Sequence, residues 1–188
     1  MLNQISPLSS TEAKSEDAVD LLIGCHQRIR HFTGVAVKLA HAQGAAANEI
    51  VEAAAGVHRY YSVSLPLHEA DEEETLRPRI ASLADDKTRH ALQAMSDQHQ
   101  AIDDLLERLL PLLLMVKNNP ETLHAAGAEM CSISKALEEM FQAHLTMEEE
   151  AIFPAIRSAL PEEARAEILR EMRERRGQGS GGSRLAAS

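Results

Sequence analysis

The chain has 188 residues, 44% of them hydrophobic but only 3% aromatic, so its core must consist of Leu, Ile, Ala, Val and Met, which favours helices over sheets. A formal net charge of −10 argues against binding to nucleic acid or to an anionic membrane surface. The most apolar stretch, LLERLLPLLLMV, is too short to span a bilayer, so we expect a soluble protein with no membrane partner.

The N-terminal segment 1–15 is polar and unpatterned, and we expect it to form a flexible arm. It lacks a basic segment followed by an apolar run, which argues against a secretion signal. The two cysteines, Cys25 and Cys131, form no CxxC motif and lie far apart in the sequence. This usage favours a reducing compartment, and we expect a cytoplasmic protein.

Apolar residues at helical spacing predict a first helix over about 17–43, with Gly44 as its C-cap. The second helix is predicted over about 45–82, where Pro66 should bend it or mark a local break. A turn follows, and a third helix runs to about residue 117.

An Asn-Asn-Pro-Glu stretch from residue 118 combines a capping residue, a first-turn proline and an acid, and predicts the start of a fourth helix that ends near residue 160. Four long helices with short connections predict an all-α, up-down-up-down four-helix bundle over residues 16–160. A short C-terminal fifth helix is expected over 161–176, and the Gly/Ser-rich segment 177–188 should be a flexible tail.

Two segments of the chain nearly repeat each other. HEADEEETLRPRI begins at His68, and HLTMEEEAIFPAI begins at His144. Both fit His-x-x-x-Glu-Glu-Glu-x-(Leu/Ile)-x-Pro-x-Ile. A fainter repeat pairs HQRI at His26 with HQAI at His99, at nearly the same separation along the chain. Each helical hairpin therefore carries a short motif and then a long one, which predicts a pseudo-twofold axis relating the two hairpins.

Residues four apart lie on one face of a helix, so each long motif presents an imidazole and a carboxylate to the same side. Imidazole with carboxylate is a ligand set for iron, manganese or zinc, and buried carboxylates require a compensating positive charge. We therefore predict that His26 and His68 bind one ion, that His99 and His144 bind a second, and that Glu72 and Glu148 bridge them.

The alternative is that these residues have no metal role. A single histidine on a helix is usually a surface or a satisfied core residue, and a Glu-Glu-Glu run is usually a solvated face. Two matching units in register with two further matched histidines are much harder to explain in this way, and a structural role would still require partners for every buried charge.

The arrangement of a His, a His-x-x-x-Glu, a second His and a second His-x-x-x-Glu on four helices resembles the hemerythrin-like, or HHE cation-binding, family over residues 17–160. This resemblance implies a non-haem di-iron centre with an oxo or hydroxo bridge, held by the six residues above. Met95 stands where the oxygen-carrying hemerythrins have a further histidine, and Glu148 replaces an Asp one residue further on. The chain thus resembles the symmetric branch of the family, which includes iron-centre repair proteins and the iron- and oxygen-sensing domain of an F-box protein.

That sensing domain has an extra carboxylate ligand, which Glu69 resembles. Against this role, a residue adjacent to His68 points about 100° away around a regular helix, unless a distortion at Pro66 closes the gap. Tyr61 lies on the same face as His68, where it either packs in the core or approaches the site. Ile29 and Ile102 should form apolar walls beside the histidines.

The sequence favours a di-iron protein that binds or reduces a small oxidant (O2, NO or H2O2) in oxidative or nitrosative stress protection or in iron-centre repair. One alternative is an iron or oxygen sensor that signals to a protein partner through the fifth helix or the termini. A second is a store or carrier of iron or oxygen. The sequence has no nucleophile, base dyad or phosphate-binding loop. It leaves open whether the protein is an enzyme and whether manganese or zinc replaces iron.

Overall fold

The structure is a computed structural model that describes residues 17–181, and within this range every regular element is a helix. The predicted arm over 1–15 and the end of the predicted tail, 182–188, lie outside the described residues. The elements in chain order are α1 (Ala18–Ala40), α2 (Ala47–Arg59), η1 (Tyr60–Ser64), α3 (Leu65–Ala70), η2 (Asp71–Leu76), α4 (Arg77–Ala81), α5 (Asp86–Asn118), η3 (Pro120–Thr122), α6 (Leu123–Met147), η4 (Glu148–Ile152), α7 (Phe153–Ala159) and α8 (Glu162–Gly181).

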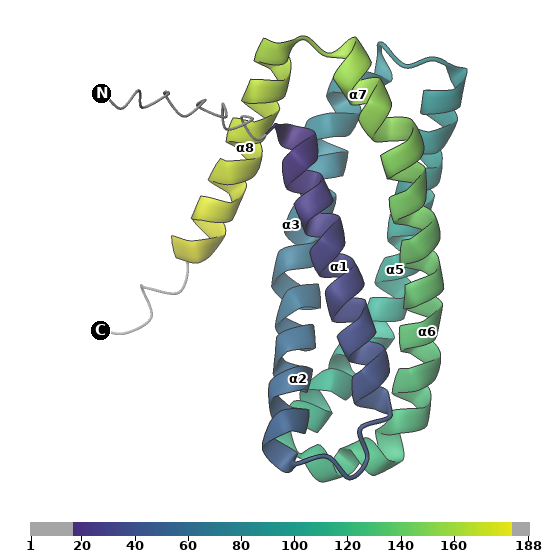
Figure 1. The fold of residues 1–188 in the computed structure, drawn as a ribbon, viewed down its shortest axis with the longest axis vertical. Coiled ribbons are helices and arrows are strands. Elements are labelled where there is room, and N and C mark those ends of the chain that lie inside the picture. Colours follow the sequence, from purple (N-terminus) through teal and green to yellow (C-terminus); the bar gives the residue numbers. More distant parts are fainter. Residues whose placement is uncertain (1–16, 182–188) are drawn as a thin grey trace, which may run out of the picture.

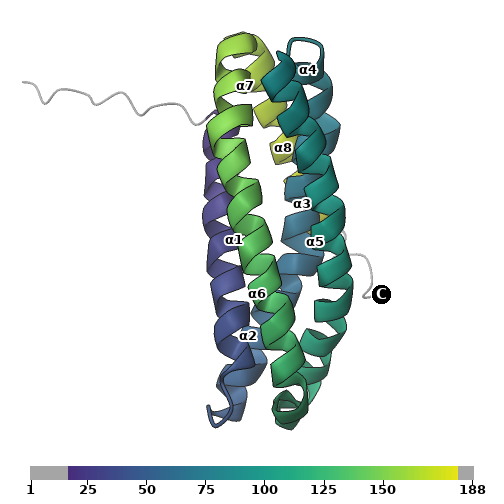
Figure 2. The same ribbon diagram turned by 90° about the vertical axis from the view of Figure 1, so that its right-hand side faces the viewer.

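These elements form four long antiparallel rods and one shorter helix (Figures 1 and 2). The first rod is α1, the second runs from α2 through α4, the third is α5, and the fourth joins α6 to α7. Successive rods pack side by side, and α1 closes the bundle against α6. The prediction of an all-α, up-down-up-down bundle with an additional C-terminal helix is therefore confirmed.

The sequence signals for helix starts are present as hydrogen bonds. Asp17 caps α1 by accepting from the backbone N–H of Asp20, whose own carboxylate accepts from the N–H of Asp17. Asp85 caps α5 by accepting from the N–H of Thr88 at 2.8 Å, and Asn119 caps η3. These bonds satisfy N–H groups that have no partner within the helix.

The predicted end of the first helix is slightly too late, because α1 ends at Ala40 and not at residue 43. Gly44 lies in the connection to α2 with a φ of +99°. This left-handed conformation is available to glycine at little cost, so Gly44 shapes the turn itself.

Three π-helical turns, η1, η2 and η4, are each followed by a single residue and then a proline. The N–H groups of Leu65, Arg77 and Phe153 donate to carbonyls five positions earlier, and the next residues are Pro66, Pro78 and Pro154. A proline lacks the N–H that an α-helix requires and clashes with the carbonyl four positions before it. A widened turn accommodates that carbonyl, so the expected local break at Pro66 takes the form of a π-turn in a continuous rod.

The apolar core is divided into two clusters by a polar layer. Leu22 and Met95 belong to the cluster near α8, whereas Ile29 and Ile102 belong to the cluster towards the opposite end of the bundle. The buried histidines of α1 and α5 fall between these pairs along their helices. The polar layer is therefore enclosed by packed aliphatic side chains on both sides.

The C-terminal helix α8 packs against α1 and η2 (Figure 1). Ile168, Leu169 and Met172 are its buried apolar side chains. The helix continues to Gly181 and not only to the expected residue 176. Once a helix has formed, each further residue adds a backbone hydrogen bond, which can extend it into a sequence of low helix propensity.

Candidate metal centre

The structure brings all six predicted ligands together in the polar layer of the bundle. His26, His68, Glu72 and Glu148 form one group in which all ligand atoms lie within 4.8 Å of one another. Glu72 and Glu148 belong also to a second such group, which His99 and His144 complete. All six residues are buried, and the two carboxylates are common to both groups. Each group contains the two histidines that the sequence predicts for one ion, and metal binding by these residues stays a prediction.

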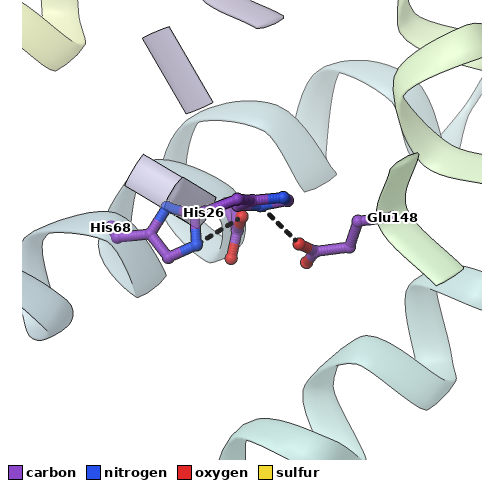
Figure 3. Close-up of side chains that lie close together, drawn as sticks. His26, His68 and Glu148 are labelled. Atoms are coloured by element: carbon purple, nitrogen blue, oxygen red, sulfur yellow. Dashed lines mark ion pairs between the residues drawn. The ribbon is translucent and has the colours of Figure 1, made fainter. Parts of the chain in front are cut away.

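The two halves of the centre have nearly the same geometry. His68 Nε2 lies 3.2 Å from Glu72 Oε1 one helical turn later, and the equivalent distance from His144 to Glu148 is 3.3 Å. Each glutamate also faces an imidazole from another rod. Glu148 lies 3.0 Å from His26 Nε2 (Figure 3), and Glu72 lies 3.3 Å from His99 Nε2. These matched distances support the expected pseudo-twofold relation.

The π-turns explain why glutamate and proline recur together. Glu72 and Glu148 each lie at the start of a π-turn, where their own backbone carbonyls accept the bond from the residue five positions later. The proline that follows that donor fixes the position of the widened turn. The repeated proline therefore acts on the backbone that carries each glutamate.

Two further glutamates fix the orientation of the imidazoles on α1 and α5. His26 Nδ1 donates to Glu149 Oε1 at 2.8 Å, and His99 Nδ1 donates to Glu73 Oε1 at 3.0 Å. A carboxylate can only accept, so each ring carries its proton on Nδ1 and directs the Nε2 lone pair towards the centre. Arg30 Nη2 donates to the same oxygen of Glu149 at 3.0 Å.

His144 has a different orienting partner, the side-chain amide of Gln98, whose Oε1 lies 3.0 Å from His144 Nδ1. The orienting roles of Glu73, Glu149 and Gln98 were not predicted from the sequence. A signal for the first two was present, because they are the second glutamates of the two matched Glu-Glu-Glu runs. The third glutamates, Glu74 and Glu150, are exposed, so only part of each run is a solvated face.

The centre contains most of the buried side-chain polar atoms that lack a hydrogen-bond partner in the described residues. Seven of the nine belong to His26, His68, Glu72 and Glu148. Burying a polar atom without a partner is costly, and both carboxylates have both oxygens in this state. A positive ion coordinated by these atoms would remove the cost, so the donor set fits a pair of metal ions. Metal-binding histidines typically donate their other ring N–H to a carboxylate or an amide, as His26, His99 and His144 do.

Comparison with known protein families agrees with this geometry. The profile described as the hemerythrin HHE cation binding domain matches residues 17–156. The chain belongs to the hemerythrin family. Among curated proteins, none matches the chain significantly. The match covers the bundle up to α7, so α8 lies outside this hemerythrin domain.

Without metal, the electrostatics of the hemerythrin domain favour neutral side chains at the centre. Burial raises the pKa of Glu72 well above its usual range, and burial together with the Glu72 carboxyl raises the pKa of Glu148 to about 8. Burial and the neighbouring histidines lower the pKa of His68 strongly and that of His144 to about 3. The imidazoles are thus ready to act as ligands, whereas metal binding must displace protons from the carboxyl groups.

A cavity of about 10 Å³, comparable to the space that a single water molecule needs, adjoins the centre of the hemerythrin domain. Ile29, Ile102, Leu65 and Phe141 form its apolar walls, as expected for the two isoleucines. The rings of His68, His99 and His144 also line this cavity. A small molecule in the cavity would thus contact imidazoles from both halves of the centre.

Glu69 and Tyr61 stay outside the two ligand groups. Glu69 is half-buried and lines the cavity, and burial raises the pKa of its carboxyl. Tyr61 is fully buried, where its hydroxyl shares a hydrogen bond of 2.9 Å with Thr33 and its ring stacks on Phe141. Tyr61 therefore packs behind the cavity wall.

Proposed function

We propose that the hemerythrin domain holds two iron ions and uses them to bind or reduce a small oxidant such as O2, NO or H2O2. His26 and His68 would hold one ion, His99 and His144 would hold the other, and Glu72 and Glu148 would be shared by both. The observation that carries this proposal is the sharing of two buried carboxylates by two four-residue groups. Bound there, two adjacent redox-active ions would supply one electron each, so a two-electron reduction would need no organic cofactor.

The protein's own residues would control access and orientation. The aliphatic walls of the cavity favour a small uncharged molecule over bulk water, and the small volume of the cavity disfavours large substrates. Glu149, Glu73 and Gln98 hold three imidazoles in the tautomer that presents Nε2 to the centre. The proposal includes a biological role in stress protection or iron-centre repair, in which the protein would consume a small oxidant.

Iron is proposed because imidazole and carboxylate suit it, although manganese and zinc accept the same ligands. In the described part of the chain, no helix is long and apolar enough to cross a membrane. Both cysteines are free thiols, which supports the proposal of a reducing, cytoplasmic setting.

An iron or oxygen sensor is the second candidate, favoured by a specific contact between α8 and the centre. Arg176 of α8 pairs with Asp71, the residue immediately before Glu72. A change at the centre would therefore reach a helix outside the family domain that could contact a protein partner. Storage or carriage of iron or oxygen has no comparable structural feature to support it.

Metal analysis and a visible spectrum of protein purified without oxygen, repeated after exposure to air, test the proposal. About two iron ions per chain and a new near-ultraviolet charge-transfer band after exposure would support it. Rapid turnover of peroxide or nitric oxide would favour an oxidant-consuming protein, whereas iron-dependent protease resistance without turnover would favour a sensor. Two zinc ions per chain with no spectral change would contradict it.

A further inference from the structure

The C-terminal helix α8 is anchored to a buried carboxylate beside the centre. Asp71 is completely buried in η2, and both of its oxygens form ion pairs with arginines of α8. Arg175 Nη1 pairs with Oδ1, and Arg176 Nη2 lies 2.6 Å from Oδ2. Arg175 also donates to Thr75 Oγ1 at 3.0 Å. Because a buried carboxylate requires compensation, this contact holds α8 at one defined position.

A second contact of α8 reaches α1. Arg176 Nη2 lies 3.5 Å from the sulfur of Cys25, which is 4% exposed and immediately precedes His26. The two arginines therefore contact the residue before His26 and the residue before Glu72. His26 belongs to the half of the centre that His68 completes, and Asp71 lies three residues after His68 on the same rod, whereas Glu72 is common to both halves.

The internal repeat shows that the other half lacks this support. At the equivalent positions of the second hairpin, Gln98 stands in place of Cys25 and Met147 in place of Asp71. Met147 carries no charge for an arginine. Gln98 orients a histidine of its half, because its amide oxygen lies 3.0 Å from His144 Nδ1. The corresponding atom of the other half, His68 Nδ1, is buried without a hydrogen-bond partner among the described residues.

The two halves of the centre thus have matched ligands but different supports. The half with His99 and His144 has an orienting partner on both rings, supplied within the bundle. In the part of the chain that the structure describes, the half with His26 and His68 has an orienting partner on one ring only, and it is the half against which α8 packs. Since the ligands themselves repeat, the difference lies in the residues around them.

We propose that Arg175 and Arg176 of α8 are positioning residues for the half-site of His26 and His68, so that the ion there is retained only while α8 is docked. They act through Asp71, whose backbone N–H bonds to the carbonyl of His68, on the turn that carries His68, and through Cys25 on the turn of α1 that carries His26. The ion at His99 and His144 is held by the bundle alone. The inference rests on the proposed function in that it requires two bound ions.

The expected size of the effect follows from the role of outer residues at metal sites. Partners that orient a ligand typically contribute about 10- to 100-fold in metal affinity. Undocking α8 would also leave Asp71 without its counter-charges, which would disturb the turn that carries His68. With α8 undocked, the protein would therefore hold a stable ion at His99 and His144 and an exchangeable ion at His26 and His68.

The rate at which metal-loaded protein releases iron to an excess of a coloured chelator tests this proposal. In the full chain with Arg175→Gln and Arg176→Gln, about half of the metal should leave roughly 10-fold faster or more, and the other half at the wild-type rate. Gln98→Leu should accelerate the other half instead, and the combined variant should accelerate both. Arg170→Gln is the matched control, since Arg170 of α8 is exposed and pairs only with Glu167 and Glu174 among the described contacts.

Asp71→Asn is the second variant, because it removes the charge of the side chain without changing its shape. It should also accelerate the release of about half of the metal. Equal acceleration of all the metal in the arginine variant, or no acceleration, would overturn the inference while leaving the proposed function standing. A wild-type protein that cannot be loaded with two ions would overturn both. Faster amide hydrogen exchange in α8 of the metal-free arginine variant is the expected structural signature, independent of any activity.

Discussion

Glu72 and Glu148, which occupy equivalent positions in the two hairpins, each face one imidazole from their own rod and one from another rod, at distances of 3.0 to 3.3 Å. Glu72 thus joins the second rod to the third, and Glu148 joins the fourth rod to the first. This arrangement also means that neither half of the centre is complete without the helical hairpin that supplies the other half. The symmetry of the sequence is thus a property of the site as well as of the fold.

Removal of either bridging carboxylate should disrupt both ion positions. We expect Glu72→Ala or Glu148→Ala to lower the metal content of purified protein from about two ions per chain to one or fewer. A 100-fold loss of affinity would also remove about 2.7 kcal/mol of metal-linked stability. Metal analysis and thermal unfolding measure the two effects.

Glu150→Ala is the control, because Glu150 is exposed and belongs to the same acidic run. Its metal content should equal that of the wild type. Unchanged metal content in both Glu72→Ala and Glu148→Ala would remove the bridging role from these residues.

The glutamates that orient the rings predict a smaller effect with a distinct signature. Glu149→Gln and Glu73→Gln keep an acceptor oxygen near His26 and His99 but remove the negative charge. We expect metal affinity to fall by about 10- to 100-fold in each variant, with little change in the helicity of the metal-free protein. Competition with a chelator of known affinity measures the change.

Because Glu149 and Glu73 occupy equivalent positions in the repeat, their substitutions should have similar effects. Their neighbours differ, because Arg30 bonds to Glu149 and Ser96 bonds to Glu73. An affinity loss confined to one variant would show that one of these neighbours contributes the difference. Wild-type affinity in both variants would contradict the orienting role.

Much of this architecture follows from sequence patterns. Helical spacing and capping residues were sufficient to predict the helices of the bundle, because they act locally. The repeat was sufficient to predict how the two hairpins are related, because its residues recur in register. The convergence of His26, His68, His99 and His144 also followed, since a pseudo-twofold relation brings repeated residues together. The capping role of Asn119 needed only its immediate neighbours.

Other features could not be predicted because they depend on contacts between distant segments. The pairing of Asp71 with Arg175 and Arg176 joins the second rod to the C-terminal helix, far apart in the sequence, and no repeat marks it. The π-turns could not be predicted because the sequence does not show whether a proline breaks the helix or is accommodated by a widened turn within a continuous helix. The end of α1 was misplaced because Gly44 marks a turn residue and not the cap itself.

The walls of the cavity predict a separation between metal binding and reaction with oxidant. Ile102→Phe should fill the cavity of about 10 Å³ and slow the reaction of the loaded protein with O2 or H2O2 by at least tenfold. Metal content should remain that of the wild type, because Ile102 is not a ligand, although overpacking costs about 1–3 kcal/mol of stability. Stopped-flow absorbance and metal analysis separate the two quantities.

Leu113→Phe is a matched control, since Leu113 is a fully buried residue of the same apolar cluster and does not line the cavity. It should cost similar stability without slowing the reaction. Equal slowing in both variants would show that general destabilisation, and not access, limits the rate.

The buried carboxyl groups predict that metal-free protein loses stability as the pH rises above neutrality. The pKa of Glu148 is raised in the folded state from 4.5 to about 8, so between these values the folded state binds more protons than the unfolded state. The free energy of unfolding must therefore fall with rising pH in this window. His144 has the opposite effect only between about 3 and 6.5, because its folded-state pKa is lowered. Above pH 6.5 this opposing contribution fades as the imidazoles of the unfolded chain lose their protons, and the carboxyl contribution dominates.

Raising the pH from 6.5 to 8 should thus lower the free energy of unfolding of metal-free protein by on the order of 2 kcal/mol through Glu148, with Glu72 acting in the same direction. Urea unfolding at the two pH values measures it. Glu148→Gln, which cannot ionise, should reduce the loss, and metal-loaded wild type should show none, since bound cations stabilise the ionised carboxylates. A metal-free protein equally stable at both pH values would show that these carboxyl groups are already compensated without metal.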